Sequence, residues 1–448
     1  MKICFLAMSG VRVKSKELAA LGVTLPGFIR RGKVIASMPS LGLLTLAACT
    51  PKNIEIDYKE IEEMSQLEGM KEYDLVAISS FTAQIYEAYR VADSLRKEGI
   101  IVVMGGLHVS SLPEEAKEHA HAVIIGEGEA VWGDLISDLQ SGHLKPFYSS
   151  FDRSPFPLAN SPVPRFDLLD LDKYNRVTIQ TSRGCTHNCE FCASSRLISK
   201  WYRQKPVERV LAEVDKVIER WEHPFIEFAD DNSFVNKRWT THFLRELSKR
   251  KVRWFTETDI SIADNDEALD LLRESGCRQL LIGFESVSKK SLSGIDSSNW
   301  KLARRDHYLE AIHKIQSRGV SVNGCFITGL DGDGPEVFEE IRDFIVESQL
   351  IEAQITVLTP FPGTRLYERL KSEGRLLKDK YWDSCTLFDV NYKPKNMTVR
   401  ELEEGLLWLF GEIYSEEAFS KRKRHYMNIV RSLGARRGSM TMKGGVVL

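Results

Sequence analysis

Histidine, a surplus of positive charge, long apolar runs and paired cysteines are all scarce or missing in this chain of 448 residues. The first histidine is His108. The net charge of −2 argues against a general nucleic-acid binder, whose phosphate contacts need a basic surplus. No apolar run approaches the length of a membrane span, and the apolar start after Lys2 is too short for a signal peptide. We therefore expect a cytoplasmic protein without a transmembrane segment.

A disulfide framework is not expected either, because three of the eight cysteines share one short stretch, TSRGCTHNCEFCASS. These are Cys185, Cys189 and Cys192, which follow a β-branched run at 177–179 and a glycine, Gly184, that lets the backbone turn. Three thiolates spaced Cys-x3-Cys-x2-Cys on one loop suit an iron–sulfur cluster. A cubane cluster has four irons to ligate, so one iron is left open for chemistry.

A zinc knuckle with His187 as the fourth ligand is the alternative. Structural zinc usually takes two ligand pairs that are well separated in sequence, and no second pair follows here. The cluster is therefore favoured. The other cysteines are expected to be small buried hydrophobic residues, and they are Cys4, Cys49, Cys277, Cys325 and Cys385.

The segment CTHNCEFC resembles the signature of the radical S-adenosylmethionine (radical SAM) enzymes at all three cysteines, and Phe191 stands where an aromatic residue usually precedes the third. The resemblance implies a [4Fe–4S] cluster held by Cys185, Cys189 and Cys192, with S-adenosylmethionine chelating the open iron. It also implies that an electron from the cluster cleaves S-adenosylmethionine to a 5′-deoxyadenosyl radical. An electron donor such as ferredoxin or flavodoxin is therefore an expected partner.

Residues 1–150 alternate strand and helix patterns, which predicts an α/β domain with a doubly wound parallel sheet. Ligands of such folds lie outside the carboxyl ends of the strands. The expected strands are Lys2–Met8, Ile54–Tyr58, Leu75–Ser79, Ile100–Met104 and Ala122–Ile125. The expected helices are Leu41–Ala48, Ile85–Lys97 and Glu114–His119.

Small and polar residues gather after three of these strands, where paired glycines would let a bulky ligand approach the backbone. With PSLGLLTLAA upstream, GGLHVSSLPEE and IIGEGEAVW resemble the Rossmann-like cobalamin-binding domain that precedes many radical SAM modules. The resemblance implies that cobalamin is bound at this edge. The candidate contacts are Ser79, Ser80, Phe81, Thr82, Gly105, Gly106, His108, Gly126, Glu127 and Gly128.

The resemblance has a gap, because residues 9–40 contain no histidine. Domains that ligate cobalt through histidine carry an Asp-x-His-x-x-Gly motif in that region. Either the corrinoid binds with no histidine below it, or the domain no longer binds it, and the glycine-rich loops favour binding. His108 is either a contact to the corrinoid or its nucleotide tail, or a histidine that caps the following helix. Glu127 and Glu129 are either cofactor contacts or acids at a helix N-terminus.

A run with Pro155, Pro157, Pro162 and Pro164 predicts an extended linker over 151–175. A second strand–helix series over 176–365 predicts a partial, six-stranded, TIM-like barrel with functional residues at the carboxyl ends of its strands. The expected strands are Thr178–Thr181, Phe225–Ala229, Val252–Glu257, Gln279–Phe284, Val320–Ile327 and Ala353–Leu358. The expected helices include Pro206–Arg220, Thr240–Arg250, Glu267–Ser275, Leu302–Arg318 and Glu336–Ser348.

Polar residues end these barrel strands, which suits S-adenosylmethionine because it carries an ammonium, a carboxylate and a diol. A plain strand-to-helix turn would also explain the pair at 231–232. By resemblance, Asp230, Asp231 and Asn232 hold the methionyl ammonium, Glu285 and Ser286 meet the ribose or carboxylate, and Phe326 and Thr328 belong to a segment, 325–330, that contacts adenine through its backbone.

Residues 366–448 are expected to form a helical C-terminal domain that covers the barrel, since Leu402–Ile413 shows helical apolar spacing. The basic run Lys421–His425 would fit an anionic substrate, an acidic partner or a lipid surface, although a solvated face is the default.

Residues from about 40 to 415 together resemble the cobalamin-dependent radical SAM methyltransferases of class B, and PRFDLLDLDKY and LTPFPGTRLYERL resemble the branch with hopanoid methylases. The implied reaction is methylation of an unactivated carbon, which has no lone pair. A hydrogen atom is removed by the deoxyadenosyl radical, and the carbon radical takes the methyl group of methylcobalamin.

Two other functions stay open at this point. One is a non-methylating radical reaction, such as cyclisation, coupling or dehydrogenation, with a vestigial or non-donating cobalamin domain. The other is a non-catalytic corrinoid or metal sensor. The substrate is open among a lipid, a tetrapyrrole, a small metabolite and a residue of a partner protein.

Overall fold

The computed structural model describes residues 1–20, 34–36, 38–194, 197–199 and 201–443. These residues fall into two compact units. The first takes in the described residues up to Asp231 together with Thr359–Lys393, and the second takes in Asn232–Leu358 and the described residues from Pro394 on. The chain therefore enters the first unit twice, at its start and again after Leu358.

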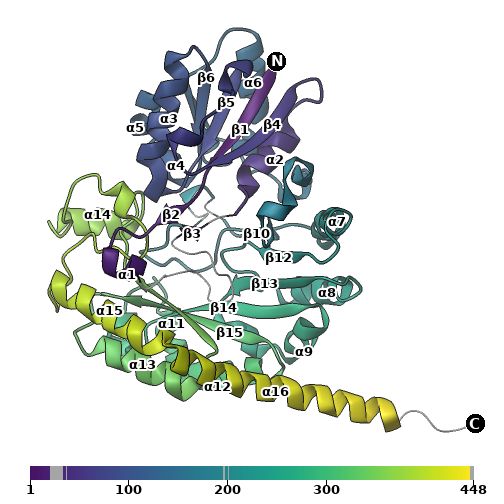
Figure 1. Ribbon diagram of the computed structural model, residues 1–448, viewed down its shortest axis with the longest axis vertical. Coiled ribbons are helices and arrows are strands. Elements are labelled where there is room, and N and C mark those ends of the chain that lie inside the picture. Colours follow the sequence, from purple (N-terminus) through teal and green to yellow (C-terminus); the bar gives the residue numbers. More distant parts are fainter. Residues whose placement is uncertain (21–33, 37, 195–196, 200, 444–448) are drawn as a thin grey trace, which may run out of the picture. The chain divides into compact units, whose positions relative to one another are not determined.

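A six-stranded sheet in the order β4-β1-β5-β6-β7-β8 forms the centre of the first unit (Figure 1). All its pairings are parallel, as the alternation of strands and helices predicted. The five expected strands are confirmed, and a sixth, β8, joins the edge. The strands are β1 (Lys2–Met8), β4 (Glu55–Ile61), β5 (Leu75–Ser79), β6 (Ile101–Gly105), β7 (Ala122–Ile125) and β8 (Phe147–Ser149).

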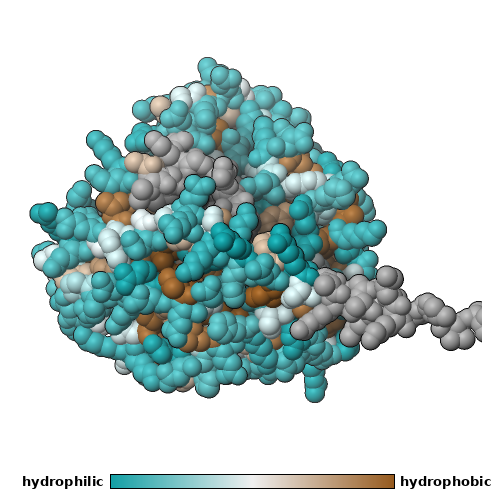
Figure 2. Space-filling view, turned by 60° about the horizontal axis from the view of Figure 1, so that its bottom comes forward, coloured by the Kyte–Doolittle hydropathy of each residue, from teal (hydrophilic) through white to brown (hydrophobic). Residues whose placement is uncertain are grey.

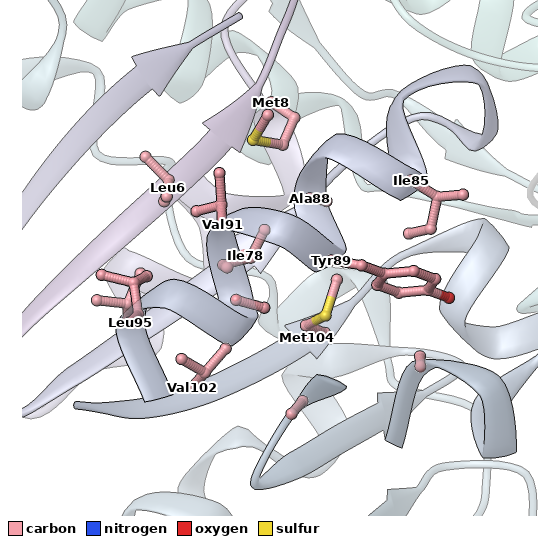
Figure 3. Packing of buried hydrophobic residues seen from close by; sticks show 14 of the residues in the cluster. Leu6, Met8, Ile78, Ile85, Ala88, Tyr89, Val91, Leu95, Val102 and Met104 are labelled. Carbon is pink, nitrogen blue, oxygen red and sulfur yellow. The ribbon is translucent and has the colours of Figure 1, made fainter. Parts of the chain in front are cut away.

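Both faces of this sheet are buried. Along β1, Leu6 and Met8 belong to one hydrophobic core, and Ile3 and Phe5 belong to the core on the other face. Successive side chains of a strand point to opposite faces, so a strand that is apolar throughout needs cover on both. Figure 3 shows the first of these cores, where side chains of the helix at 85–97 pack over the strands.

The covering helices include the three that were expected. The helices of this part are α1 (Lys16–Ala20), α2 (Leu41–Cys49), α3 (Ile85–Lys97), α4 (Leu107–Ser111), α5 (Pro113–His119) and α6 (Trp132–Gln140). A short antiparallel pair, β2 (Val11–Arg12) and β3 (Val34–Ala36), lies outside the main sheet. Ser40 begins α2 by accepting a hydrogen bond from the backbone N–H of Leu43.

The segment Thr359–Lys393 also packs within the first unit. It contains α14 (Arg365–Ser372), and its buried residues Tyr381, Trp382 and Cys385 belong to the same core as α3. The first part of the C-terminal region predicted from 366 onward thus packs on the first sheet's core, because two large aromatic side chains and a cysteine of this loop find apolar partners there.

All six strands of the second series are present. In the first unit, β9 (Val177–Ile179) pairs in parallel with β12 (Phe225–Phe228). In the second unit, β13 (Arg253–Thr258), β14 (Cys277–Glu285), β15 (Ser321–Thr328) and β16 (Glu352–Val357) pair in parallel in that order. The curvature of a partial barrel stays a prediction.

Helices follow these strands as expected, with one difference. The stretch 302–318 is not one helix, because α11 ends at Arg304, a 3-10 turn occupies Arg305–His307, and α12 begins at Tyr308. At this turn the Arg305 side chain donates to the Val287 carbonyl. The helices are α7 (Val207–Ile218), α8 (Lys237–Leu247), α9 (Asp266–Glu274), α10 (Lys289–Leu292), α11 (Trp300–Arg304), α12 (Tyr308–Ser317) and α13 (Val337–Ser348).

The chain ends in two long helices, α15 (Val399–Tyr414) and α16 (Glu416–Lys443). A capping box begins α15, in which Thr398 and Glu401 satisfy each other's backbone N–H groups. Over the part of the chain that the structure describes, every helix is too short or too polar to cross a membrane. The face shown in Figure 2 is mostly hydrophilic, with apolar residues scattered across it.

Candidate functional site

The three cysteines lie in the loop of a small hairpin. Its stem consists of β10 (Ser182–Arg183) and β11 (Arg203–Gln204), which pair antiparallel, and Cys185, Cys189 and Cys192 lie between them and are partly buried. Gly184 begins the loop with a φ of 86°, and a Cβ there would lie 2.7 Å from the carbonyl oxygen of Trp201. Only glycine fits this turn, as the sequence indicated.

Neighbouring elements of the first unit hold this loop. Glu190 forms an ion pair with Arg369 of α14, at 2.7 Å, and its carbonyl accepts from the Leu366 N–H. Arg365 of α14 donates to the Asn188 carbonyl. The cysteine loop is therefore fixed to α14 by charge-assisted bonds.

The Cys192 thiol is in a low-polarity environment. Burial raises the pKa of Cys192 to about 11, so without a metal this thiol is protonated at neutral pH. Within the described ranges, no three His, Cys, Asp or Glu side chains are already gathered as a metal-binding group. The donor set fits an iron–sulfur cluster nevertheless, because three sulfur ligands on one loop are what such a cluster takes.

The carboxyl edge of the first sheet exposes three large apolar side chains among its small and polar residues. Phe81 after β5 is 48% exposed and Phe151 after β8 is 46% exposed, and Leu107 after β6 is also exposed. The hydroxyl of Ser80 is buried with no hydrogen-bond partner. A broad, mostly apolar group with peripheral amides, such as a corrinoid, fits an edge of this kind because it covers apolar area and supplies partners to a buried hydroxyl.

Two glycines at this edge have little room for a side chain. Gly106, with a φ of 112°, would place a Cβ 3.3 Å from Ser79 Oγ, and Gly126, with a φ of 84°, would place one in collision with Ser150 Oγ. Ser110 Oγ and Ser150 Oγ accept hydrogen bonds from the backbone N–H groups of Gly126 and Glu127. The loop after β7 is therefore rigid, while Thr82 simply begins a 3-10 turn after β5.

His108 does not lie on the open surface of this edge. It belongs to α4, its side chain has no exposed surface, and its Nε2 lies 3.5 Å from Glu115. Its ring packs edge-on against Trp382, 5.6 Å between centroids. The sequence offered a corrinoid contact or a helix cap. The structure places the ring beside the partly buried Glu115 carboxylate in the first turn of α5, and a corrinoid contact stays a prediction.

Glu127 and Glu129 were expected to contact the cofactor or to sit at a helix N-terminus. The structure shows both carboxylates paired with Arg183, at 2.7 Å each. Sequence reasoning did not single out Arg183 or its neighbour across the hairpin, Arg203, because a two-residue strand has no periodic signal.

Asp230 is buried and holds the strand that leads into the cysteine loop. Its carboxylate accepts hydrogen bonds from the backbone N–H groups of Thr181 and Ser182, at 2.7 and 2.9 Å, and from the Thr181 hydroxyl. Asp231 accepts from the backbone N–H of Gly184, at 3.2 Å. The two aspartates therefore position the cysteine loop, and contact with S-adenosylmethionine stays a prediction.

In the second unit, Asn232 donates to Asp259 at 2.7 Å and is buried. Glu285 ends β14 in the left-handed region, with a φ of 62°, where a non-glycine residue is strained. Its carboxylate pairs with the buried Lys301 at 2.9 Å. Such strain is often found at functional positions, which is consistent with the predicted ligand contact.

The remaining predicted contacts are buried. Ser286 has no exposed surface, and its hydroxyl accepts from the Ser288 N–H. Phe326 stacks on Phe284, 5.7 Å between ring centroids, and the Thr328 hydroxyl donates to the Thr356 carbonyl. The side chains of Phe326 and Thr328 are thus used in packing and hydrogen bonding within the protein. Any contact of this segment to adenine would be made by its backbone, as predicted.

Comparisons with known proteins support the two-part arrangement. Residues 179–345 match the model of the radical SAM superfamily, residues 29–136 match the B12 binding domain, and residues 364–446 match a domain of unknown function, DUF4070. The chain thus combines a B12 binding domain with a radical SAM domain.

Several named relatives are similar to this protein over most of its length. Bacteriochlorophyllide d C-12(1)-methyltransferase of Chlorobaculum tepidum is 29% identical over 392 residues, covering 86% of this chain and 84% of that protein. Hopanoid C-2 methylase of Rhodopseudomonas palustris is 28% identical over 363 residues, covering 77% and 67%. The fold is similar to that of the radical SAM methyltransferase TsrM of Kitasatospora setae, with a TM-score of 0.66, 15% identity and coverage of 83% and 76%.

The fold and the cysteine loop define a radical SAM enzyme with a cobalamin-binding domain ahead of its catalytic module. The chain is similar, more narrowly, to methyltransferases of this kind, and its cofactors are a [4Fe–4S] cluster, S-adenosylmethionine and cobalamin.

Proposed function

We propose that this enzyme methylates an unactivated carbon of its substrate. In this proposal the carboxyl edge of the first sheet binds cobalamin, and the cysteine loop with the ends of the second strand series binds the cluster and S-adenosylmethionine. The observation that carries the proposal is the cysteine loop, which follows the β10 strand and is tied within one unit to the loop after β7 of the B12 binding domain. When bound, the cluster supplies the electron that cleaves S-adenosylmethionine, and cobalamin supplies the methyl group.

Cys185, Cys189 and Cys192 are proposed to hold the cluster, and the acceptor bonds of Asp230 and Asp231 orient their loop. This orientation supports catalysis because the reacting groups of a radical reaction must be held in line. Asn232, Glu285 and Ser286 are proposed to meet S-adenosylmethionine, with the backbone of 326–328 against its adenine.

The apolar rim of Phe81, Leu107 and Phe151 is proposed to lie against the corrinoid, with Ser80 as a hydrogen-bond partner of one of its amides. Residues 9–40 contain no histidine, so we propose that the corrinoid binds without a histidine ligand from this segment. The apolar side chains also exclude water from the methyl group.

A reducing partner is required, and a ferredoxin or flavodoxin in the cytoplasm fits this need. The substrate is one of the classes that the sequence left open. The names of the two relatives supply the first probes, a bacteriochlorophyllide and a hopanoid.

The test is anaerobic incubation of the reconstituted protein with a chemical reductant, S-adenosylmethionine carrying a CD3 methyl group, and extracts of its host or these two probes. A product heavier by one labelled methyl group is expected, together with 5′-deoxyadenosine. Formation of 5′-deoxyadenosine with a changed but unlabelled product would instead establish a cyclisation, coupling or dehydrogenation. No cleavage of S-adenosylmethionine at all would contradict both.

A further inference from the structure

The stem of the cysteine hairpin carries two like charges opposite each other. In the register of β10 and β11, Arg183 pairs directly with Arg203. The Arg183 side chain is only 9% exposed and that of Arg203 18%. Like charges directly opposite on antiparallel strands are destabilising, and burial removes most of the water that would screen them.

Two carboxylates from the first sheet's edge compensate this charge. Glu127 pairs with both arginines, and its contact to Arg183 measures 2.7 Å. Glu129 pairs with Arg183 at 2.7 Å. We call these four residues the stem charge cluster; it holds two positive and two negative groups. Burial alone would raise the pKa of Glu129, but Arg183 outweighs it and the net pKa is lowered.

The acidic loop is itself well fixed, so it can act as a reference point for the hairpin. The Glu127 carboxylate also accepts from the Phe156 N–H at 3.0 Å, and its own N–H donates to Ser150 Oγ at 2.7 Å. Arg183 donates in addition to Gln180 Oε1 at 3.0 Å. The planar guanidinium thus has partners on all three nitrogens, which fixes its orientation as well as its distance.

Stability alone gives little reason for such a cluster. Buried ion pairs lose much of their attraction to desolvation, and apolar residues of similar size often stabilise a protein as well or better. What a charge pair does supply is one defined geometry between two segments, because removal of either partner leaves a buried charge uncompensated. The two segments here are the loop after β7 and the strand that ends one residue before Gly184.

We propose that Glu127 and Glu129 are positioning residues that set the cysteine loop against the carboxyl edge of the first sheet, so that corrinoid binding and cluster binding are energetically coupled. This rests on the proposed function, because it takes that edge as the corrinoid site. The acids do not touch the reacting atoms. They act through Arg183 and Arg203, whose hairpin closes only when its two charges are neutralised.

Coupling of this kind is reciprocal and can be measured without turnover. Hydroxocobalamin is titrated into the full-length protein with and without the reconstituted cluster. For the wild type, we expect the Kd to fall by about fivefold or more when the cluster is present, the lower end of ordinary coupling between sites. In Glu127→Gln the two Kd values should agree within about twofold.

Charge rescue separates positioning from simple loss of structure. Glu127→Gln leaves one acid for two arginines, whereas Glu127→Gln/Arg203→Gln restores the balance. The double variant should regain most of the difference in Kd. The matched control is Glu227→Gln, which removes the carboxylate of another buried arginine pair, with Arg176, and should keep the wild-type difference.

A second readout is the rate at which a chelator removes iron from the reconstituted cluster, measured alongside circular dichroism. We expect faster loss in Glu127→Gln and Glu129→Gln by about tenfold, with rescue in the double variant, and no change in the control. Wild-type rates in both acid variants, or a double variant no better than the single one, would overturn the proposal. If the wild type binds no hydroxocobalamin, the proposed role of cobalamin fails and the coupling fails with it. If the wild type binds hydroxocobalamin with the same Kd in the presence and absence of the cluster, only the coupling is refuted.

Discussion

The two candidate cofactor edges differ in how far their polar groups are already used inside the protein. The edge of the first sheet presents exposed Phe81 and Phe151 and a buried, unpartnered Ser80 hydroxyl. At the ends of the second series, Asp230 accepts from backbone N–H groups and Glu285 pairs with Lys301. In the proposed assignment, the first edge would bind cobalamin by covering apolar area, whereas the second would bind S-adenosylmethionine through charges that are held in place before the ligand arrives.

Loss of one cluster ligand is expected to have the largest effect, because it removes the chemistry from both edges. Cys189→Ser should lose the reconstituted cluster and all detectable cleavage of S-adenosylmethionine, measured as iron and sulfide content and as 5′-deoxyadenosine formed. Cys49→Ser, a partly buried cysteine outside the loop, is the control and should keep both. A Cys189→Ser protein with full iron content would refute the assignment.

Removal of the ion pair between Glu285 and Lys301, at the end of β14, tests the proposed S-adenosylmethionine contacts of the second strand series. Lys301→Met leaves the Glu285 carboxylate buried and uncompensated, which should lower the free energy of unfolding by about 3–5 kcal/mol and weaken S-adenosylmethionine binding. Urea denaturation and equilibrium titration measure the two effects. Lys289→Met breaks an exposed pair with Asp306 and should cost less than about 1 kcal/mol. An equal loss of unfolding free energy in Lys301→Met and Lys289→Met would contradict the expected difference between the buried and the exposed ion pair.

The pH dependence of stability tests the same edge at the loop after β15. Asp333 is buried and accepts from the Gly329 and Leu330 N–H groups, and burial raises its pKa to about 6. A raised carboxyl pKa means that the folded state binds the proton more tightly than the unfolded state. Its stabilising contribution is therefore present below pH 4 and is lost as the pH rises through about 6.

Asp333→Asn should accordingly flatten this decline, by roughly 2–3 kcal/mol between pH 4 and 7. Urea unfolding of the two proteins at several pH values measures the difference. Parallel curves would show that the carboxyl group of Asp333 titrates normally.

The smallest expected effect on stability comes from a substitution at the carboxyl edge of the first sheet. Gly126→Ala places a methyl group against Ser150 at a positive φ, which should lower the free energy of unfolding by about 1–3 kcal/mol and reduce the cobalamin bound per chain. Thermal unfolding and the cobalamin absorbance measure these. Gly133→Ala is the control, since a Cβ there has no neighbour within 4 Å. Unchanged cobalamin content in Gly126→Ala would place the corrinoid elsewhere.

Much of the fold could be predicted from the sequence, because continuous apolar strands and amphipathic helices leave a clear local pattern. The strand at Lys2–Met8 and the helix at Ile85–Lys97 have the bounds that the pattern indicated. The edge strand Phe147–Ser149 was missed, since three residues are too few for any period to show.

The candidate site was predictable in its residue types and less so in its contacts. Cys-x3-Cys-x2-Cys and the polar strand ends are visible as letters, but the partners of Asp230 and of Glu127 lie 49 and 56 residues away. Such partners depend on tertiary packing, which no local spacing encodes. His108 illustrates the same limit, because its burial beside Trp382 depends on a segment far along the chain.

The order of synthesis follows from where the neutralising acids lie in the chain. Glu129 leaves the ribosome 54 residues before Arg183, and N-terminal domains generally fold first during translation. The two acids are thus synthesised before the arginines and cysteines that they position, whereas the first unit is complete only after Thr359–Lys393 has been added.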